Sequence, residues 1–448
     1  MEQKPSFASV LGNRGFLNLW INQILVQLSY NSLNFALIIW VFQLTGSNTA
    51  VAALLLAVYL PAVLLGLFTG VLVDLMDRKK IILMINFFLC LAFFSLIFLK
   101  DIYPAILAVA FFVNALGQFY APAEASAIPL IVKRPQLLTA NSFFSITLYS
   151  CFLLGFGLAG PFINHFGINF VFSLGGIFLG IAFFLALFFP SIRAEPDSQG
   201  KKLILALKSS RFKQIKEVGL YEIRETIHLI RGKLPVLSSI IILAGVQMVI
   251  GILAVLMPAL LERSLNIKAT DASYILIIPL GAGIVTGGLI LSRIGHLLVR
   301  RRLVAKATIF GGLLFFLMGV APIRPQPLPF FSQLPLSSVV AVGSFLLGMV
   351  MVSILVPSQT VLQENTPEDM RGKVYSVLGV AMAGLSLIPV LLSGILADIF
   401  GPMPIVLAMG AIIMLAGAFG LKPNLFFAKK SLPYHMREFL GLGHWEGK

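Results

Sequence analysis

The strongest constraint on this chain is a series of long apolar runs with few charges inside them. Twelve such runs lie between polar breaks, and most exceed the roughly 18 to 20 residues that a helix needs to cross a bilayer. The apolar residues are continuous rather than alternating, which favours helices over barrel strands. Of the 448 residues 58% are apolar and only 11% charged, too few to cover a soluble domain. The sequence therefore predicts an all-α polytopic membrane protein.

The runs divide into two sets of six, which we expect to form two pseudo-symmetric six-helix bundles. The predicted spans lie near residues 16–43, 50–73, 81–99, 104–124, 140–163 and 168–190, and then near 237–261, 271–294, 303–322, 337–363, 373–398 and 402–421. The expected organisation is an N-terminal bundle over residues 1–190, a cytoplasmic amphipathic linker over 191–236, a C-terminal bundle over 237–421 and a cytoplasmic tail over 422–448.

Proline and glycine spacings repeat between the two sets. Pro61 lies nine residues before Gly70 in the second span, and Pro279 lies nine residues before Gly288 in the eighth. The fifth and eleventh spans share a glycine pair seven residues apart, Gly160 and Gly167 in one and Gly394 and Gly401 in the other. Two related six-helix halves around a central site are a known plan of secondary transporters.

The basic residues predict the orientation in the membrane. With both termini in the cytoplasm, 29 of the 33 Lys and Arg fall on the inside, and the outside holds Lys100, Arg263, Lys268 and Arg324. The linker alone carries ten of them on an amphipathic pattern, which predicts a helix lying on the inner leaflet, with a regulatory partner site as the alternative. The net charge of +15 thus reports contact with the lipid bilayer and not with nucleic acid. We expect a multi-pass protein of the cell membrane.

A conspicuous motif follows the second span, with the sequence GVLVDLMDRKK from Gly70 to Lys80. It resembles the signature of the major facilitator superfamily, and it is most similar to the branch of macrolide-efflux proteins and the enterobactin exporter. Further similarities are Pro122-Ala-Glu124, the segment from Thr366 to Lys373 and the segment from Tyr221 to Arg231. The resemblance implies a secondary transporter.

The resemblance also implies a cytoplasmic latch that holds the outward-facing state closed at its inner end. Its residues here would be Gly70, Asp74, Asp77, Arg78 and Lys79. A glycine lets a neighbouring helix approach, and a carboxylate can face helix N-terminal amides or a cation. Leu75 stands where the family usually has arginine, which predicts a weaker latch. The alternative is a solvated turn.

Acidic residues are absent from the middle of the predicted spans, since Asp74, Glu124, Glu364 and Asp398 all lie near span ends. Ionisable groups inside the membrane are the usual proton relays. The fifth span ends in Gly160-Pro161, similar to a motif of proton-driven exporters, whereas Val113 stands where many drug–proton antiporters have arginine. Glu124 is the candidate coupling residue, with protons as the candidate coupling ion.

Uncharged polar side chains follow a stripe on the first span and recur on the fourth and seventh. They are Gln23, Gln27, Asn31, Asn34, Asn114, Gln118 and Gln247. Amides in hydrocarbon need partners, so they face other helices or a wet cavity. The family plan places these three spans around a central pathway, which predicts that the amides line it; interhelical hydrogen bonding is the alternative. With no central carboxylate, a neutral or amphiphilic substrate fits best.

Three functions follow from these patterns. The first is export of a small drug-like or siderophore-like molecule, and the second is translocation of lysophospholipid or another lipid by the same fold. A membrane-embedded enzyme is disfavoured, because the five histidines show no metal-ligand spacing and no nucleophile lies near them. No nucleotide-binding loop is present, so transport would use an ion gradient. We expect a monomer with a small-molecule substrate, no metal and no cofactor.

Overall fold

The structure of the protein is a computed structural model that describes residues 10–189, 230, 232–294, 299–320, 336–367 and 370–421. Most of the predicted linker and the whole predicted tail lie outside these residues. The described residues form helices joined by short turns. Twelve of the helices are long and apolar enough to cross a membrane, which confirms the predicted fold class.

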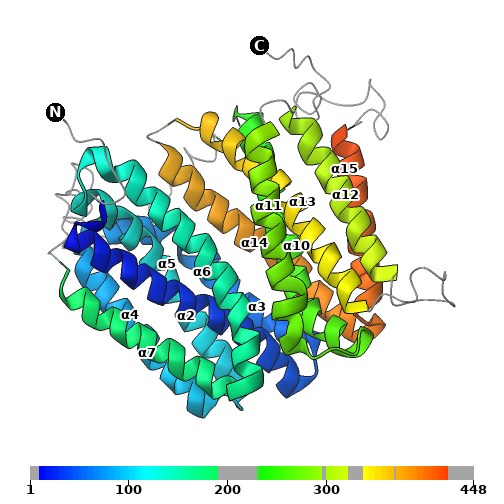
Figure 1. Cartoon of the computed structure of the whole chain (residues 1–448), viewed down its shortest axis with the longest axis horizontal. Coiled ribbons are helices and arrows are strands. Elements are labelled where there is room, and N and C mark those ends of the chain that lie inside the picture. Colours follow the sequence, from blue (N-terminus) through cyan, green and yellow to red (C-terminus); the bar gives the residue numbers. More distant parts are fainter. Residues whose placement is uncertain are drawn as a thin grey trace, which may run out of the picture. The chain divides into compact units, whose positions relative to one another are not determined.

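Six of these helices come from each half of the chain (Figure 1). In the first half they are α2 (Arg14–Thr45), α3 (Asn48–Leu75), α4 (Arg78–Leu99), α5 (Tyr103–Ile131), α6 (Leu137–Phe166) and α7 (Ile168–Leu187). In the second half they are α10 (Leu234–Ala259), α11 (Ile278–Ile294), α12 (Arg300–Val320), α13 (Leu336–Glu364), α14 (Arg371–Phe400) and α15 (Pro402–Leu421).

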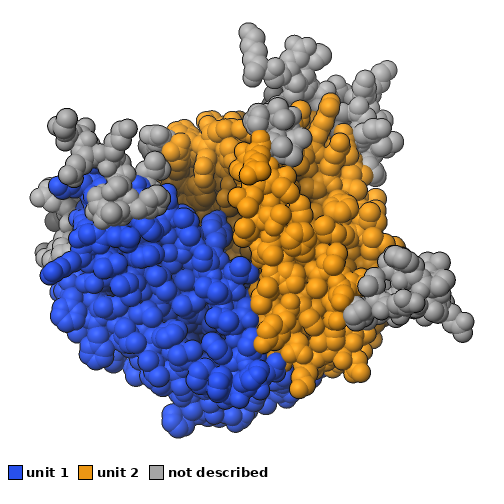
Figure 2. Space-filling view, in the orientation of Figure 1, with its two compact units in different colours: residues 1–46, 53–225 blue, residues 47–52, 226–448 orange. Residues whose placement is uncertain are grey.

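The chain divides into two compact units (Figure 2). Unit 1 comprises residues 1–46 and 53–225, and unit 2 comprises residues 47–52 and 226–448. The helix α3 is therefore shared, because its first residues belong to unit 2 and the rest belongs to unit 1.

Three pairs of helices that pack together in unit 1 have equivalents in unit 2. In unit 1, α4 packs on α5 and α7, and α2 packs on α6 (Figure 1). The equivalent helices of unit 2 do the same, with α12 on α13 and α15, and α10 on α14 (Figure 1). The repeat read from the sequence is thus a repeat of helix packing.

Glycines of the repeat end equivalent helices. Gly167 (φ 78°) ends α6 and Gly401 (φ 83°) ends α14. Their amides donate to Ile163 and Ala397, each four residues earlier. A positive φ strains residues that carry a Cβ, so glycine is required at this position in both halves.

The helix α5 differs from the predicted span near 104–124. It continues through Pro122 and Pro129 to Ile131, so Glu124 lies about two turns before its end. The prediction ended the span at the Pro122-Ala-Glu124 segment, but the helix does not stop at either proline. Glu124 is consequently deeper in the bundle than the sequence indicated, with 6% of its surface exposed.

Candidate functional site

Glu124 belongs to a buried polar cluster formed by three helices of unit 1. The hydroxyl oxygen of Tyr120, one turn earlier in α5, lies 2.9 Å from Glu124 Oε1 and 2.9 Å from Asn22 Oδ1 of α2. The Asn22 amide nitrogen donates to the carbonyl of Ala182 in α7 at 2.7 Å. Asn22 is fully buried and Tyr120 is 3% exposed. A carboxyl group is therefore held by polar partners in an interior that is otherwise apolar.

Two amides of the predicted stripe on α2 contact neighbouring backbone. Gln23 is buried, and its amide nitrogen donates to the carbonyl of Phe144 in α6 at 3.2 Å. Asn31 is also buried and donates to the carbonyl of Gln27 in its own helix at 2.8 Å. A Cβ at Gly155 of α6 would come within 2.6 Å of Asn31 Cβ, so the two helices approach closely there. Glycine permits this approach.

Asn114 on α5 pairs with a tyrosine of α2. The Tyr30 hydroxyl donates to Asn114 Oδ1, and the Asn114 amide nitrogen donates to Ala110 of its own helix at 2.8 Å. The Tyr30 ring lies over Gly117, where an added Cβ would be 3.6 Å from ring atoms. This contact joins α2 and α5 about two turns from the Glu124 cluster.

The other amides of the predicted pathway keep part of their surface exposed. Gln27 and Asn34 of α2 and Gln118 of α5 are half-buried in unit 1. Gln247 is half-buried in α10 of unit 2. The seven residues thus divide into buried amides between helices and part-exposed amides.

The motif after α3 joins helices inside unit 1. Asp77 caps α4 by accepting from the Lys79 backbone amide at 3.0 Å, and Lys79 Nζ donates to the carbonyls of Leu187 and Phe189 at the end of α7 at 2.8 and 2.7 Å. A cation at a helix C-terminus satisfies unpaired carbonyls and is favoured by the helix dipole. Gly70 and Asp74 lie in α3, but the surroundings of their side chains fall outside the described part of the structure.

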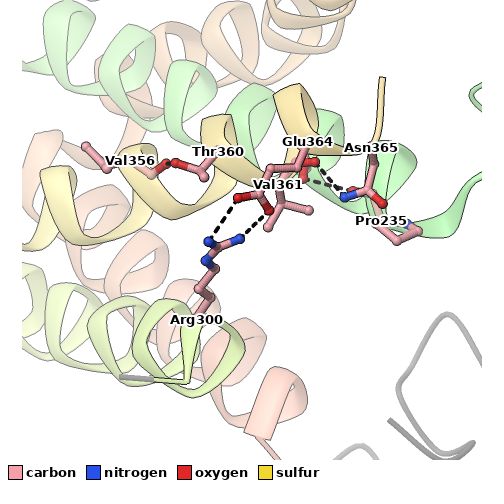
Figure 3. Close-up of polar contacts among 8 residues, drawn as sticks. Pro235, Arg300, Val356, Thr360, Val361, Glu364 and Asn365 are labelled. Atoms are coloured by element: carbon pink, nitrogen blue, oxygen red, sulfur yellow. Dashed lines mark hydrogen bonds and ion pairs between the residues drawn. The ribbon is translucent and has the colours of Figure 1, made fainter. Parts of the chain in front are cut away.

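The first residue of α4 reaches α5, and unit 2 repeats this contact. Arg78 is 4% exposed, and its Nε lies 3.5 Å from Ser126 Oγ. In unit 2 the first residue of α12, Arg300, forms a two-pronged ion pair with Glu364 at the end of α13, at 2.5 and 3.0 Å (Figure 3). An arginine at the start of a helix thus contacts the equivalent neighbouring helix in both units. The contact is to the hydroxyl of Ser126 in unit 1 and to the carboxylate of Glu364 in unit 2.

The sequence profile of the Major Facilitator Superfamily matches residues 19–390, most of both units. The chain belongs to this superfamily. A curated relative, the uncharacterized MFS-type transporter YfiS of Bacillus subtilis (strain 168), is 22% identical over 424 residues, covering 93% of this chain and 94% of the relative.

Solved structures of superfamily transporters share the fold at low identity. An auto-inhibited peptide transporter of the POT family is 15% identical with a TM-score of 0.66, over 94% of this chain and 99% of the other. A D-xylose–proton symporter is 13% identical with a TM-score of 0.64, over 96% and 99%. These likenesses support the major facilitator fold. Membership of the superfamily implies transport rather than catalysis.

Sequence reasoning missed several partners that the major facilitator fold brings together. Asn22 lies beside the predicted stripe on α2, and Tyr120 and Tyr30 were not considered. Tyr120 and Glu124 are four residues apart, a spacing that puts two side chains on one face of a helix. That signal was available in the sequence. No such signal marks the contacts of Asn22 and Tyr30 in the sequence, because these contacts join residues 84 to 160 positions apart.

Proposed function

We propose that this protein is a secondary active transporter that exports a small amphiphilic molecule, drug-like or siderophore-like, by alternating access and at the expense of an ion gradient. The observation that carries the proposal is the polar part of the unit 1 interior, where buried amides and hydroxyls accompany the buried carboxyl of Glu124 among the described residues. Such an interior suits a neutral or weakly polar solute, because a permanent cation would need a facing carboxylate. Export is supported by the resemblance of the α3–α4 motif to the macrolide-efflux branch.

Protons are the proposed coupling ion, and Glu124 is the proposed coupling residue. It is the buried acid among the described residues of unit 1, and it connects to two other helices through Tyr120 and Asn22. Among the structures with the same fold, one is described as a D-xylose–proton symporter. In this proposal, proton binding and release at Glu124 bias the exchange between the two transport states.

The proposed substrate-pathway residues are the part-exposed amides Gln27, Asn34 and Gln118 of unit 1 and Gln247 of unit 2. Gln23, Asn31 and Asn114 support the pathway by holding the helices on which these amides lie. The residues Gly70, Asp74, Asp77, Arg78 and Lys79 form the gate at its cytoplasmic end. The protein lies in the cell membrane as a monomer with both termini in the cytoplasm.

An efflux screen in a pump-deficient host tests the proposal. We expect the wild-type protein to lower the accumulation of at least one amphiphilic dye or antibiotic, and a protonophore to abolish this effect. Glu124→Gln, which keeps the size of the side chain but cannot release a proton, should abolish active efflux at normal expression. Efflux that persists with the protonophore present would reject proton coupling. A full screen with no exported compound would reject the export of drug-like molecules.

Lipid translocation is the second candidate, favoured by a groove on unit 1. A cavity of about 250 Å³ between α4 and α5 is lined by apolar side chains apart from Ser95, with Phe88, Leu91 and Phe112 exposed around it. Such a groove would accept an acyl chain. Ala108 lines this cavity, and Ala108→Phe would fill it. Uptake of lysophospholipid into inverted vesicles that is lost in this variant would support lipid translocation over drug export.

A further inference from the structure

If the Glu124 carboxyl is ionised, the Tyr120 hydroxyl faces two acceptor atoms but has only one hydrogen to donate. The Tyr120 hydroxyl carries one proton, and its oxygen lies 2.9 Å from both Asn22 Oδ1 and Glu124 Oε1. A hydroxyl can donate to only one of these atoms, and an ionised carboxylate is an acceptor only. One of the two contacts must then lack a proton.

The orientation of the Asn22 amide decides which contact this is. Its nitrogen lies 2.7 Å from the carbonyl oxygen of Ala182. Turning the amide around would place its oxygen against that carbonyl, so Nδ2 must face Ala182 and Oδ1 must face Tyr120. Asn22 therefore presents an acceptor to Tyr120, and because Asn22 is fully buried this acceptor needs the hydrogen bond that the tyrosine hydroxyl donates. The remaining contact, between Tyr120 and Glu124, requires a proton on Glu124.

We infer that Glu124 is protonated in this conformation, and that Tyr120 and Asn22 form a hydrogen-bond switch that transmits the protonation state of Glu124 to α2. This inference rests on the proposed function, because it explains how a coupling proton acts on helix packing. The protonated carboxyl donates to the Tyr120 oxygen, Tyr120 donates to Asn22, and Asn22 donates to Ala182. All donors in this chain point the same way, from α5 through α2 to α7.

Loss of the proton reverses one step of the chain. When the Glu124 O–H bond breaks and the proton passes to water, the Tyr120 hydroxyl turns to the carboxylate, since a charged acceptor binds a donor more strongly than an amide does. Asn22 Oδ1 then loses its donor in a fully buried position, and a buried acceptor without a donor is destabilising. The contact between α5 and α2 breaks while the contact between α2 and α7 remains. Deprotonation would thus loosen one helix pair selectively.

Other ionisable groups lie on the helices that pack around α5. On α4, Arg78 contacts Ser126, which is two residues beyond Glu124 and therefore on another face of α5. The other ionisable groups on α2 and α6 make other contacts or lie at exposed positions. They are Arg14 and Tyr30 on α2, and Tyr149, Cys151 and His165 on α6. The described helix α7 contains none.

The test uses dicyclohexylcarbodiimide, which modifies protonated carboxyl groups in apolar surroundings, on the purified full-length protein without substrate. Labelling of the Glu124 peptide, followed by mass spectrometry across a pH series, gives the midpoint at which the proton is lost. Asn22→Leu removes the acceptor that captures the tyrosine proton, so Tyr120 can donate to the carboxylate. We expect the midpoint to fall by about one pH unit, a tenfold weaker proton affinity. Tyr120→Phe removes the donor, and the midpoint should rise.

Ser29→Ala is the matched control. Ser29 is buried on α2, and its hydroxyl oxygen lies 2.8 Å from the carbonyl oxygen of Leu25 in its own helix and 3.2 Å from that of Gly175 in α7. The variant thus removes a polar group between α2 and α7 without touching Tyr120. Its midpoint should equal that of the wild-type protein. In the alternative arrangement, Tyr120 already donates to an ionised Glu124, so Asn22→Leu would leave the midpoint unchanged or raise it. Either result would overturn the switch.

An infrared spectrum keeps the inference testable if a variant fails to fold. The wild-type protein at neutral pH should show the carbonyl band of a protonated carboxylic acid, and Glu124→Gln should lack it. Absence of the band from the wild-type protein would reject the protonated state. Neither measurement depends on transport. A failed efflux screen with the expected labelling would reject the proposed function alone. Normal proton-driven efflux without a protonated carboxyl would reject the switch alone.

Discussion

Asp398, near the end of α14, accepts two hydrogen bonds from Thr49 in the first turn of α3, one from the backbone amide at 2.9 Å and one from the hydroxyl at 2.7 Å. Asn48 adds two more, from its backbone at 2.8 Å and its side chain at 2.9 Å, and Ser47 adds a fifth at 2.6 Å. A carboxylate from a distant helix thus satisfies the free amides at the N-terminus of α3, where the helix dipole also favours a negative charge. The sequence had placed Asp398 only as an acid at a span end.

We predict that Asp398→Asn destabilises the protein by about 1 to 3 kcal/mol, because hydrogen bonds to a charged acceptor weaken and the amide offers one acceptor in place of two. Thermal unfolding of the purified protein in detergent measures the loss. Asp101→Asn is the control, since this acid has 68% of its side chain exposed and faces only Lys100 at 4.0 Å. Equal unfolding temperatures for the two variants would contradict the capping role.

Gly394, one turn before Asp398, allows α14 to approach the start of α3. A Cβ there would come within 2.7 Å of Ala52 Cβ and of the Asn48 carbonyl oxygen. We expect Gly394→Ala to cost about 1 to 3 kcal/mol through this overpacking. Gly379→Ala, in the same helix with open space around it, should be neutral or slightly stabilising because alanine favours helix. Similar destabilisation of both variants would contradict the role of the close contact at Gly394.

The ion pair between Arg300 and Glu364 is well aligned but exposed, with 49% and 53% of the two side chains accessible (Figure 3). Water screens such a pair, so we predict a coupling energy of at most about 1 kcal/mol in a double-mutant cycle of Arg300→Ala and Glu364→Ala. The coupling should decrease as salt is added. A larger coupling that resists salt would indicate that the pair is buried in the working protein.

Cysteine accessibility should separate the part-exposed amides from the buried ones. In a background without Cys90 and Cys151, we predict that cysteines at Gln27 and Gln118 react with a small polar thiol reagent, because these positions retain exposed surface. A cysteine at Asn31 should react at least tenfold more slowly, since Asn31 is 9% exposed and packs on Gly155. Uniform reactivity at the three positions would reject the proposed division, and substrate protection at Gln27 would support a pathway there.

The sequence alone determined the number of spans, the repeat and most helix ends, because these depend on local chemistry. Run length decides whether a helix crosses the bilayer, and caps such as Asn13, Asp77 and Gly167 act within a few residues. Equivalent glycines in both halves could therefore be matched by spacing and lie at equivalent helix ends.

Only the tertiary structure decided which polar groups meet. In a soluble protein an apolar stripe shows which face of a helix points inward, but lipid is as apolar as the interior of this protein, so that signal is weak here. Packing between residues far apart in the chain sets how each helix is rotated about its axis. It turns α2 so that Asn22 meets Tyr120, and it turns α14 so that Asp398 meets Thr49. The depth of Glu124 depends on the continuation of α5 through Pro122 and Pro129, whereas the prediction ended the span at Glu124.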